Sequence, residues 1–443
     1  MDTKFKKTFL AIFVVFIVLA LVPFLIPMGA YIAQIEQAAS QKLGVPVKIA
    51  SLHFAVLPTP RANVKGLVVG NNEDIRVADV AAVLDVTTLF DDVRVVSRLD
   101  VDEPVLKQSA LALLGAIAAR QGESSGPAPV ELRRIVVAGA RIEMDGMNLP
   151  TMDADIALAA GGKLEKALLT GSEGKLSIDL VPKDAGYAAE IKAEKWTPPV
   201  GPRLVFDKLT ANLEYAGSTL KFPQVEASLY RGSLIASGKL DWKKNWRLSG
   251  SIKTNGIELG DATRLFTRTV KVTGRITGNG KFSSTANTPG KFADAMMLDY
   301  KFSVTDGVLY GMDLVKAASL LIRQGMTGGE TRFDELGGTL YTRGKQVEVR
   351  PVHIVSGLLA ADGHVKVMPD KSLSGKIDAD IKKGISLVTV PLVISGTMDS
   401  PMVLPTKAAL AGGAAGTVLM GPLGTGLGVK AGSALDKLFG GGE

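Results

Sequence analysis

The chain has 443 residues, of which 46% are hydrophobic, and it contains no cysteine. The lack of cysteine excludes disulfide bonds, thiolate metal sites, iron–sulfur clusters and cysteine nucleophiles. The net charge of +7, from 51 basic and 44 acidic residues, is small for this length, so the composition gives no indication of a nucleic-acid partner.

The first predicted element is a transmembrane helix at residues 8–28, a stretch without charged residues. About 20 apolar residues suffice for a helix to cross the core of a bilayer. The predicted membrane anchor is formed by its large apolar side chains, Phe9, Ile12, Phe13, Phe16, Leu19, Leu21, Phe24 and Leu25. The alternative is a cleaved signal peptide, but its apolar region usually has only about 7–15 residues. The longer stretch favours an uncleaved anchor.

The orientation of this helix follows from the basic residues beside it. Lys4, Lys6 and Lys7 precede the helix, and no comparable basic cluster comes directly after it. Basic residues next to a membrane helix stay on the cytoplasmic side. Residues 1–7 are therefore a predicted cytoplasmic tail, and the remainder of the chain is expected on the other side of the membrane.

An N-terminal module is predicted at residues 29–120. It begins with a helix over Tyr31–Lys42, which Gly44 and Pro46 end, and it finishes with a second helix over Lys107–Arg120. Residues 121–129 are rich in Gly, Ser and Pro, which predicts a flexible loop after the module.

Residues 130–406 are predicted to form a strand-rich body, because apolar and polar residues alternate there with a period of two. Turn signals such as Gly278-Asn279-Gly280 predict hairpins, a mostly antiparallel sheet and about 18 strands in the whole chain. Breaks are expected at Trp196–Pro202 and at one internal helix, Asp313–Gln324. The alternation assigns these residues to a candidate apolar face: Leu209, Ala211, Leu213, Tyr215, Val225, Leu229, Leu234, Leu240, Ile377 and Ile381.

The last predicted segment is a Gly/Ala-rich tail at residues 407–443. It has the small-xxx-small spacing of packed membrane helices at Gly412 and Gly416. Two interpretations stay open, a mobile or helix-hairpin tail and a second membrane contact.

Signatures of catalysis and metal binding are weak. Gly122–Gly126 fits the Gly-x-Ser-x-Gly nucleophile pattern at Ser124, but it follows a predicted helix instead of a strand and has no partner base nearby. The three histidines are isolated, and the phosphate-binding loop spacing is missing. Asp153 and Asp155, like Asp378 and Asp380, share the wet face of a strand. We therefore predict no catalytic, cofactor-binding or metal-binding residues, and a protein that is not an enzyme.

One patch mixes aromatic rings with positive charge, Trp242-Lys243-Lys244-Asn245-Trp246-Arg247. In one interpretation Lys243–Asn245 form a hairpin turn and the two tryptophans meet across the strands. In the other the patch contacts lipid headgroups, as membrane-interface sites do.

Several strings, in their order and spacing, resemble the AsmA family of bacterial envelope proteins over nearly the whole chain. In the N-terminal part they are Leu43–Val47, Leu57–Pro58, Val64–Val69, Val77–Val80 and Val101–Leu106. In the C-terminal half they are Asp306–Leu314, Thr331–Leu336, Gly363–Val367 and Gly396–Pro401. The middle of the chain is covered least.

The resemblance implies a single-pass inner-membrane protein with its body in the periplasm and a part in outer-membrane biogenesis. Longer relatives of the TamB type are similar to groove-shaped bridges that carry lipids between membranes. The expected fold is then mainly β with a few helices, in which one transmembrane helix precedes an extended, curved, groove-like sheet. The leading hypothesis is a non-enzymatic protein that handles phospholipid along its apolar face. The alternative is a scaffold that acts on outer-membrane assembly components through protein contacts, with the apolar face packed internally.

Overall fold

The computed structural model describes residues 28–55, 59–88, 91–110, 113, 130–144, 147–184, 186–199, 203–262, 271–319, 328–383, 386–412 and 429–431. Residues 1–27, with the topology lysines and the predicted anchor up to its last residue, lie outside these ranges, as do the predicted loop 121–129 and Ser124. Among the helices that are described, none has the length and apolar character needed to cross a membrane.

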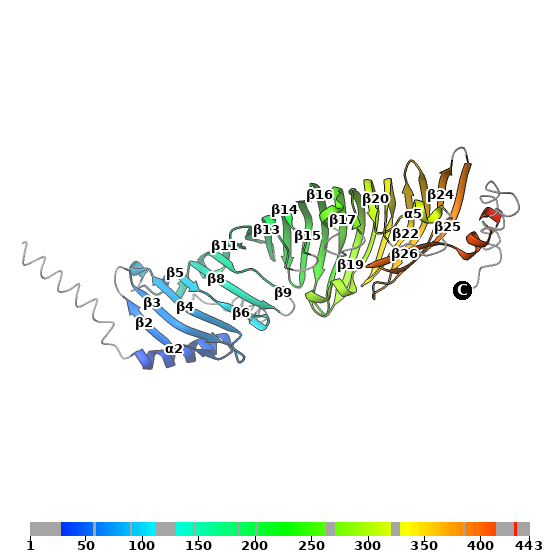
Figure 1. Ribbon diagram of the computed structural model, residues 1–443. Coiled ribbons are helices and arrows are strands. Elements are labelled where there is room, and N and C mark those ends of the chain that lie inside the picture. The colour runs from blue at the N-terminus through cyan, green and yellow to red at the C-terminus, as the bar shows by residue number, and fades with distance from the viewer. Residues whose placement is uncertain are drawn as a thin grey trace, which may run out of the picture. The chain divides into compact units, whose positions relative to one another are not determined.

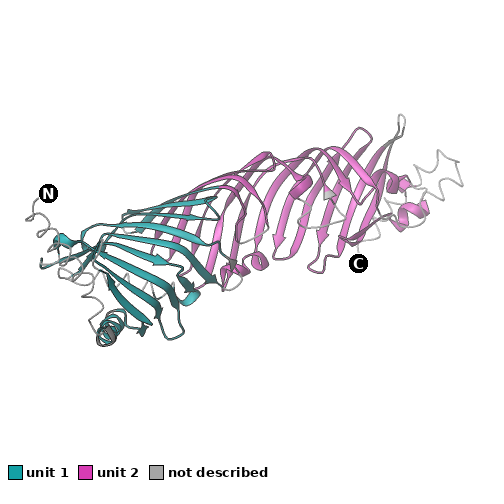
Figure 2. Ribbon diagram, turned by 60° about the vertical axis from the view of Figure 1, so that its left-hand side comes forward, with its two compact units in different colours: residues 1–193 teal, residues 194–443 magenta. Residues whose placement is uncertain are grey.

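The described residues form a mainly β, mostly antiparallel structure, as predicted (Figure 1). They contain 26 strands, more than the 18 or so expected. Several of the additional strands have only two or three residues, such as β1 (Val47–Lys48), too few for an alternating pattern to be recognised. The chain divides into two compact units, residues 1–193 and 194–443, which are coloured separately in Figure 2.

Unit 1 begins with α2 (Met28–Leu43), which confirms the helix predicted after the anchor. Gly44 ends it in the left-handed conformation, and the Glu36 carboxylate accepts a hydrogen bond from the Ile49 N–H at 2.7 Å. The strands that follow are β1, β2 (Ser51–Ala55), β3 (Arg61–Val69), β4 (Ile75–Leu84), β5 (Arg94–Asp102), β6 (Val105–Lys107), β7 (Val130–Leu132), β8 (Arg134–Met144), β9 (Met147–Asn148), β10 (Met152–Leu158), β11 (Leu164–Gly171), β12 (Leu176–Lys183) and β13 (Gly186–Trp196). Single 3-10 turns are described at Val86–Thr88 and at Ala160–Gly162. Residues 108–110 and 113, within the predicted helix Lys107–Arg120, are helical, and the remainder of that prediction lies outside the described ranges.

In unit 1, strands before residue 121 pair directly with strands after residue 129. Strands β7 and β8 pair in parallel with β5, and β8 pairs in parallel with β6. The strands on either side of the predicted loop therefore belong to the same compact unit.

Unit 2 is an antiparallel meander in which each of its long strands pairs with the next long strand. Its strands are β14 (Phe206–Ala216), β15 (Thr219–Leu229), β16 (Gly232–Asp241), β17 (Trp246–Glu258), β18 (Lys271–Val272), β19 (Arg275–Ala286), β20 (Met297–Tyr310), β21 (Glu330–Arg343), β22 (Gln346–Val355), β23 (Leu359–Val367), β24 (Leu373–Lys383), β25 (Ser386–Thr397) and β26 (Ser400–Pro405). The predicted break at Trp196–Pro202 falls between β13 and β14.

Helices in unit 2 are short. They are α4 (Leu259–Ala262), single 3-10 turns at Pro289–Lys291 and Ala293–Ala295, and α5 (Leu314–Ala318). The Asp313 carboxylate caps α5 by accepting a hydrogen bond from the Lys316 N–H at 2.9 Å. The predicted helix Asp313–Gln324 is thus found in its first half, and residues 320–327 lie outside the described ranges. Residues 407–412 and 429–431 of the predicted tail are helical.

Candidate functional site

The main feature of unit 2 is a sheet with one apolar face that extends from β14 to β26. The strand registers align side chains of this face in rows across the sheet, because residues directly opposite each other point to the same side. One row runs through Leu209, Ala227, Leu234, Thr254, Gly278, Phe302, Gly338, Val352, Gly363, Ile377, Leu392 and Pro405. The next row runs through Ala211, Val225, Ala236, Ile252, Gly280, Tyr300, Leu340, Val349, Val365, Gly375, Ile394 and Val403.

All ten residues predicted for the candidate apolar face lie on this side of the sheet. Leu209 and Leu234 belong to the first row, with Ile377, while Ala211 and Val225 belong to the second. Tyr215 lies opposite Leu220, which lies opposite Leu240, in a row nearer the end of the strands. Leu213, Leu229 and Ile381 follow by their even spacing along the same strands. The alternation therefore assigned the face without exception at these positions.

Over β20–β26 most large side chains of this apolar face are buried, and others, such as Phe302 and Val349, are partly buried and pack against them. Leu392 and Ala379 have no exposed surface, and Ile394 and Val403 are 2% exposed. They share one hydrophobic cluster with Leu314 and Ala317 of α5 and with Ala409 and Val429 of the predicted tail. This part of the face is a packed core.

Over β14–β19 the same face is covered less. The buried members of the face are mostly small or polar, such as Ala211 and Thr254, together with Leu209 and Leu229 on the first two strands. The larger side chains between them are only partly buried: Leu220, Phe222, Val225, Leu234, Leu240, Leu248, Ile252 and Phe282. A stretch of five long strands therefore leaves large apolar side chains in partial contact with solvent.

On the partly exposed part of the apolar face, two phenylalanine rings lie over glycines. A Cβ atom at Gly238 would come within 2.6 Å of Phe222 Cε2, and one at Gly250 within 2.6 Å of Phe282 Cζ. The two glycines face each other across β16 and β17, between the two phenylalanines. Because no side chain stands beneath them, the rings cover the backbone and leave a smooth apolar surface.

A buried polar pair marks the boundary between the two parts. The Thr254 and Tyr300 hydroxyls form a hydrogen bond across Gly278, whose missing side chain leaves room for the tyrosine. Burial raises the pKa of the Tyr300 phenol, and the hydrogen bond with Thr254 opposes that rise. The pair satisfies both hydroxyls where they would otherwise lose hydration.

Three aromatic rings form a stack at the end of the partly exposed part, beside the turn between β16 and β17. Tyr215 stacks on Trp242 with ring centroids 5.8 Å apart, and Trp242 stacks on Trp246 at 5.4 Å. Lys243, Lys244 and Asn245 are exposed in the turn. This confirms the prediction that the two tryptophans flank the turn and meet across it.

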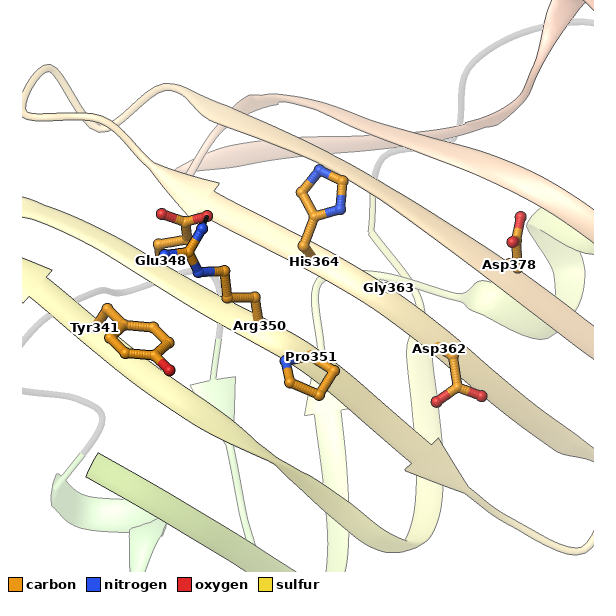
Figure 3. A pocket seen from close by; sticks show the side chains of 8 residues that line it. All are labelled: Tyr341, Glu348, Arg350, Pro351, Asp362, Gly363, His364 and Asp378. Atoms are coloured by element: carbon orange, nitrogen blue, oxygen red, sulfur yellow. Dashed lines mark ion pairs between the residues drawn. The ribbon is translucent and has the colours of Figure 1, made fainter. Parts of the chain in front are cut away.

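The opposite face of the unit 2 sheet is polar. Over β21–β24 it carries an open pocket lined by Tyr341, Glu348, Arg350, Pro351, Asp362, Gly363, His364 and Asp378 (Figure 3). Its charged groups contact protein side chains: Arg350 lies over the Tyr341 ring at 5.1 Å and 3.4 Å from the Glu348 carboxylate, while His353 Nδ1 lies 2.6 Å from the Asp362 carboxylate. Nothing in this arrangement poises a nucleophile beside a base.

The acidic pairs considered as metal ligands are engaged in the protein. Arg134 donates hydrogen bonds to Asp155, which lowers the pKa of that carboxyl, and the Gly139 N–H donates to Asp153 at 2.8 Å. Thr389 donates a hydrogen bond to Asp380 at 2.5 Å. Within the described ranges no group of three or more potential metal-ligating side chains occurs.

Unit 1 also has an apolar row across its own strands. The row consists of Leu52, Val64, Val80, Val101, Val137, Ala154, Leu169, Ile178 and Ile191. Of these only Leu52 is fully buried. The candidate face predicted from sequence omitted this row, although the same alternation is present in β3, β10 and β12.

The residues missed in unit 2 are the rings over glycine, Phe222 and Phe282. Their glycine partners, Gly238 in β16 and Gly250 in β17, are single glycines within strands, and which ring lies over which glycine depends on the register. In comparisons with known proteins, no family model, no curated protein and no solved structure matches the chain.

Proposed function

We propose that this chain is an AsmA-like, non-enzymatic protein of the bacterial envelope that handles phospholipid on the apolar face of its unit 2 sheet. The observation that carries the proposal is the continuity of that face. The rows that contribute most of their large side chains to a core over β20–β26 continue into β14–β19, where the larger side chains are mostly partly exposed.

Exposed apolar surface of this kind favours an apolar ligand. Removing apolar surface from water stabilises a complex by about 25 cal/mol for each Å² buried. Large contiguous apolar patches on a protein surface commonly mark binding sites. The acyl chains of a phospholipid, laid on the smooth surface of Phe222, Phe282 and their neighbours, cover such a patch without any specific polar contact.

The form of the sheet suits a groove. In Figure 2 the strands of unit 2 curve along their length. A sheet that curves around its apolar face would shield acyl chains and leave headgroups in water. The helices at the β24–β26 end would then close one end of this groove.

The predicted anchor at residues 8–28 completes the proposal. An uncleaved helix with Lys4, Lys6 and Lys7 on its cytoplasmic side would hold the two units in the periplasm beside the inner membrane, from which lipid is drawn. The proposed role is then one step of outer-membrane biogenesis.

The test is to purify the full chain in a mild detergent and to identify co-purified phospholipid by mass spectrometry. The informative variant is Leu234→Glu, which places a charge on the partly exposed apolar face. Its matched control is Ser233→Glu, the adjacent exposed position on the polar face. We expect phospholipid with the unaltered chain and with the control, and a several-fold loss with Leu234→Glu.

Circular dichroism of both variants checks that the fold is kept. A folded, lipid-free chain, or equal lipid retention by the two variants, would contradict the proposal.

A scaffold of outer-membrane assembly is the second candidate, and the packed core over β20–β26 favours it. A face that is sealed by the chain's own helices binds no lipid, and the protein would then act through its polar surface. Photo-crosslinkers at Lys376 and at Ser251, on the polar side of β24 and β17, would test this in cells. Capture of the same assembly component at discrete positions, together with an absence of co-purified lipid, would support the scaffold.

A further inference from the structure

The turn between β16 and β17 combines three features that occur together nowhere else among the described residues. It carries the stack of Tyr215, Trp242 and Trp246, it lies at the end of the partly exposed apolar face, and its cations are unpaired. We refer to residues 242–247 together with Tyr215 as the aromatic tip.

The rings of the aromatic tip lie on the apolar side of the sheet. Trp242 follows Leu240 by two residues and continues the ladder through its N–H, which donates to the Ser218 carbonyl at 3.0 Å. Trp246 precedes Leu248 by two residues on β17. The stack therefore continues the apolar face beyond the row of Leu220, Leu240 and Leu248 to the ends of these strands. There the apolar surface meets solvent.

The charges of the aromatic tip distinguish it from other turns of unit 2. At the turn after β15, Arg231 pairs with Glu258, and at the turn after β21, Lys345 lies 3.2 Å from Asp294. Lys243, Lys244 and Arg247 have no such ion pair among the described residues. The nearby Asp241 carboxylate instead accepts hydrogen bonds from the Lys243 N–H and the Thr219 hydroxyl.

This combination indicates an anionic, amphipathic ligand. Tryptophan and tyrosine favour the boundary between apolar and polar surroundings, because each ring has an apolar body and a polar atom. Unpaired lysines beside such a boundary attract anionic headgroups. A nucleic acid fits less well, since the Trp242 ring already stacks on Tyr215 and on Trp246 and is less available to a base.

We propose that the aromatic tip binds the headgroup of an anionic phospholipid whose acyl chains lie on the apolar face of β14–β19. This inference rests on the proposed function and assigns its preferred lipid class. Lys243 and Lys244 hold the phosphate, and the three rings cover the glycerol and the first carbons of the acyl chains.

The three tryptophans of the chain allow a direct measurement. Trp196, Trp242 and Trp246 are the full set, so Trp196→Phe leaves the two rings of the aromatic tip as the tryptophan fluorophores. The full chain with this substitution is titrated in detergent micelles with phosphatidylglycerol or phosphatidylcholine brominated near the ester end of the acyl chains. Bromine quenches tryptophan fluorescence only at short range.

The expected result is quenching by phosphatidylglycerol at a concentration about tenfold lower than by phosphatidylcholine, given the attraction of two lysines for one anionic lipid. Lys243→Glu with Lys244→Glu should abolish that preference. The matched control is Lys281→Glu with Lys301→Glu, the same charge change at two exposed positions on the polar face of the same sheet. It should shift the phosphatidylglycerol titration by less than about twofold.

Three outcomes would overturn the inference. Equal quenching by the two lipids, or equal effects of the two lysine pairs, would remove the preference for an anionic headgroup. Charge-dependent quenching with vesicles but not with dispersed lipid would assign the aromatic tip to a bilayer surface. If phospholipid co-purifies with the chain in each case, the proposed function stands and only this inference fails; if none co-purifies and no lipid quenches, the proposed function fails with it.

Discussion

The two parts of the unit 2 sheet, β14–β19 and β20–β26, carry the same alternation and the same apolar rows but have different surroundings. In the second part Val304, Leu392 and Ala379 have at most 1% of their surface exposed, whereas Leu234, Leu240 and Ile252 in the first part are only partly buried. The difference comes from what covers the sheet, since α5, Ala409 and Val429 lie over the second part.

An apolar sheet face alone therefore does not determine whether it becomes part of a core or a binding surface. A strand pattern specifies which side chains share a face, and a second layer is needed to bury them. Among the described residues the second layer is short, and its members α5, Ala409 and Val429 cluster with β20–β26. The less covered part is where we propose that phospholipid binds.

The largest expected effect separates the two parts by their stability. Leu392→Ala removes a fully buried side chain and should cost about 2–5 kcal/mol of local unfolding free energy. Leu240→Ala removes the same atoms from the partly exposed part and should cost about 1 kcal/mol. Hydrogen exchange followed by mass spectrometry reports both, through peptides of β24–β26 and of β15–β17. Equal costs would mean that the β14–β19 face is as well packed as the core.

The next effect tests the rings that lie over glycine. Gly250→Ala places a Cβ within 2.6 Å of Phe282 Cζ and closer still to the Ser237 carbonyl, so strands or ring must shift. We expect a loss of about 1–3 kcal/mol, measured by the same exchange experiment. Gly357→Ala is the control, because nothing lies within 4 Å of its new Cβ, and it should change stability by less than about 0.5 kcal/mol. A neutral Gly250→Ala would show that the sheet opens easily there.

A smaller effect on stability is expected from raising the pH, through Tyr300 at the boundary between the two parts of the unit 2 sheet. The raised pKa of Tyr300 means that the folded chain keeps this phenol protonated where the unfolded chain, with a pKa of about 10, ionises it. The contribution to stability is therefore full below about pH 10 and is lost as the pH rises above it. Chemical denaturation at pH 9 and pH 11 should show a larger loss for the unaltered chain than for Tyr300→Phe.

The control for this measurement is Tyr310→Phe on the same strand, whose side chain is 38% exposed. The Tyr310→Phe variant should lose as much stability between pH 9 and pH 11 as the unaltered chain does. A loss that is unchanged in Tyr300→Phe would show that the Thr254–Tyr300 pair is open to water.

The smallest effect is expected on a polar face, at the exposed ion pair of Arg134 and Asp155 in unit 1. Hydrogen bonding from Arg134 lowers the pKa of Asp155, so its contribution is present above the unfolded pKa of about 3.9 and is lost as the pH falls below it. Arg134→Met should lower the thermal midpoint by about 1 °C or less at pH 7 and by nothing measurable at pH 2. A drop of several degrees would show that polar faces, and not only apolar coverage, govern the stability of these sheets.

The hairpin turn predicted at Gly278-Asn279-Gly280 was wrong, because these residues lie inside β19 and pair with both β17 and β20. The sequence alone did predict the mainly β, mostly antiparallel class and the face to which each alternating residue belongs. The physical reason is local, because successive side chains of a strand point to opposite sides and a shift of one residue reverses the face. Leu209, Val225 and Ile377 could therefore be assigned together although they are far apart in the chain. The hairpin at Trp242–Trp246 was predictable for the same reason.

The sequence could not predict which part of the unit 2 apolar face is covered, because this depends on the tertiary structure. Ala409 and Val429 share a hydrophobic cluster with Leu392 and Val403, and they come from a Gly/Ala-rich segment whose composition equally fits a free tail or a membrane helix. The stacking of Tyr215 on Trp242, and of Phe282 over Gly250, depends on registers set by the bulges and hairpins of neighbouring strands. Burial is a property of two surfaces in contact, and a periodic sequence specifies only one of them.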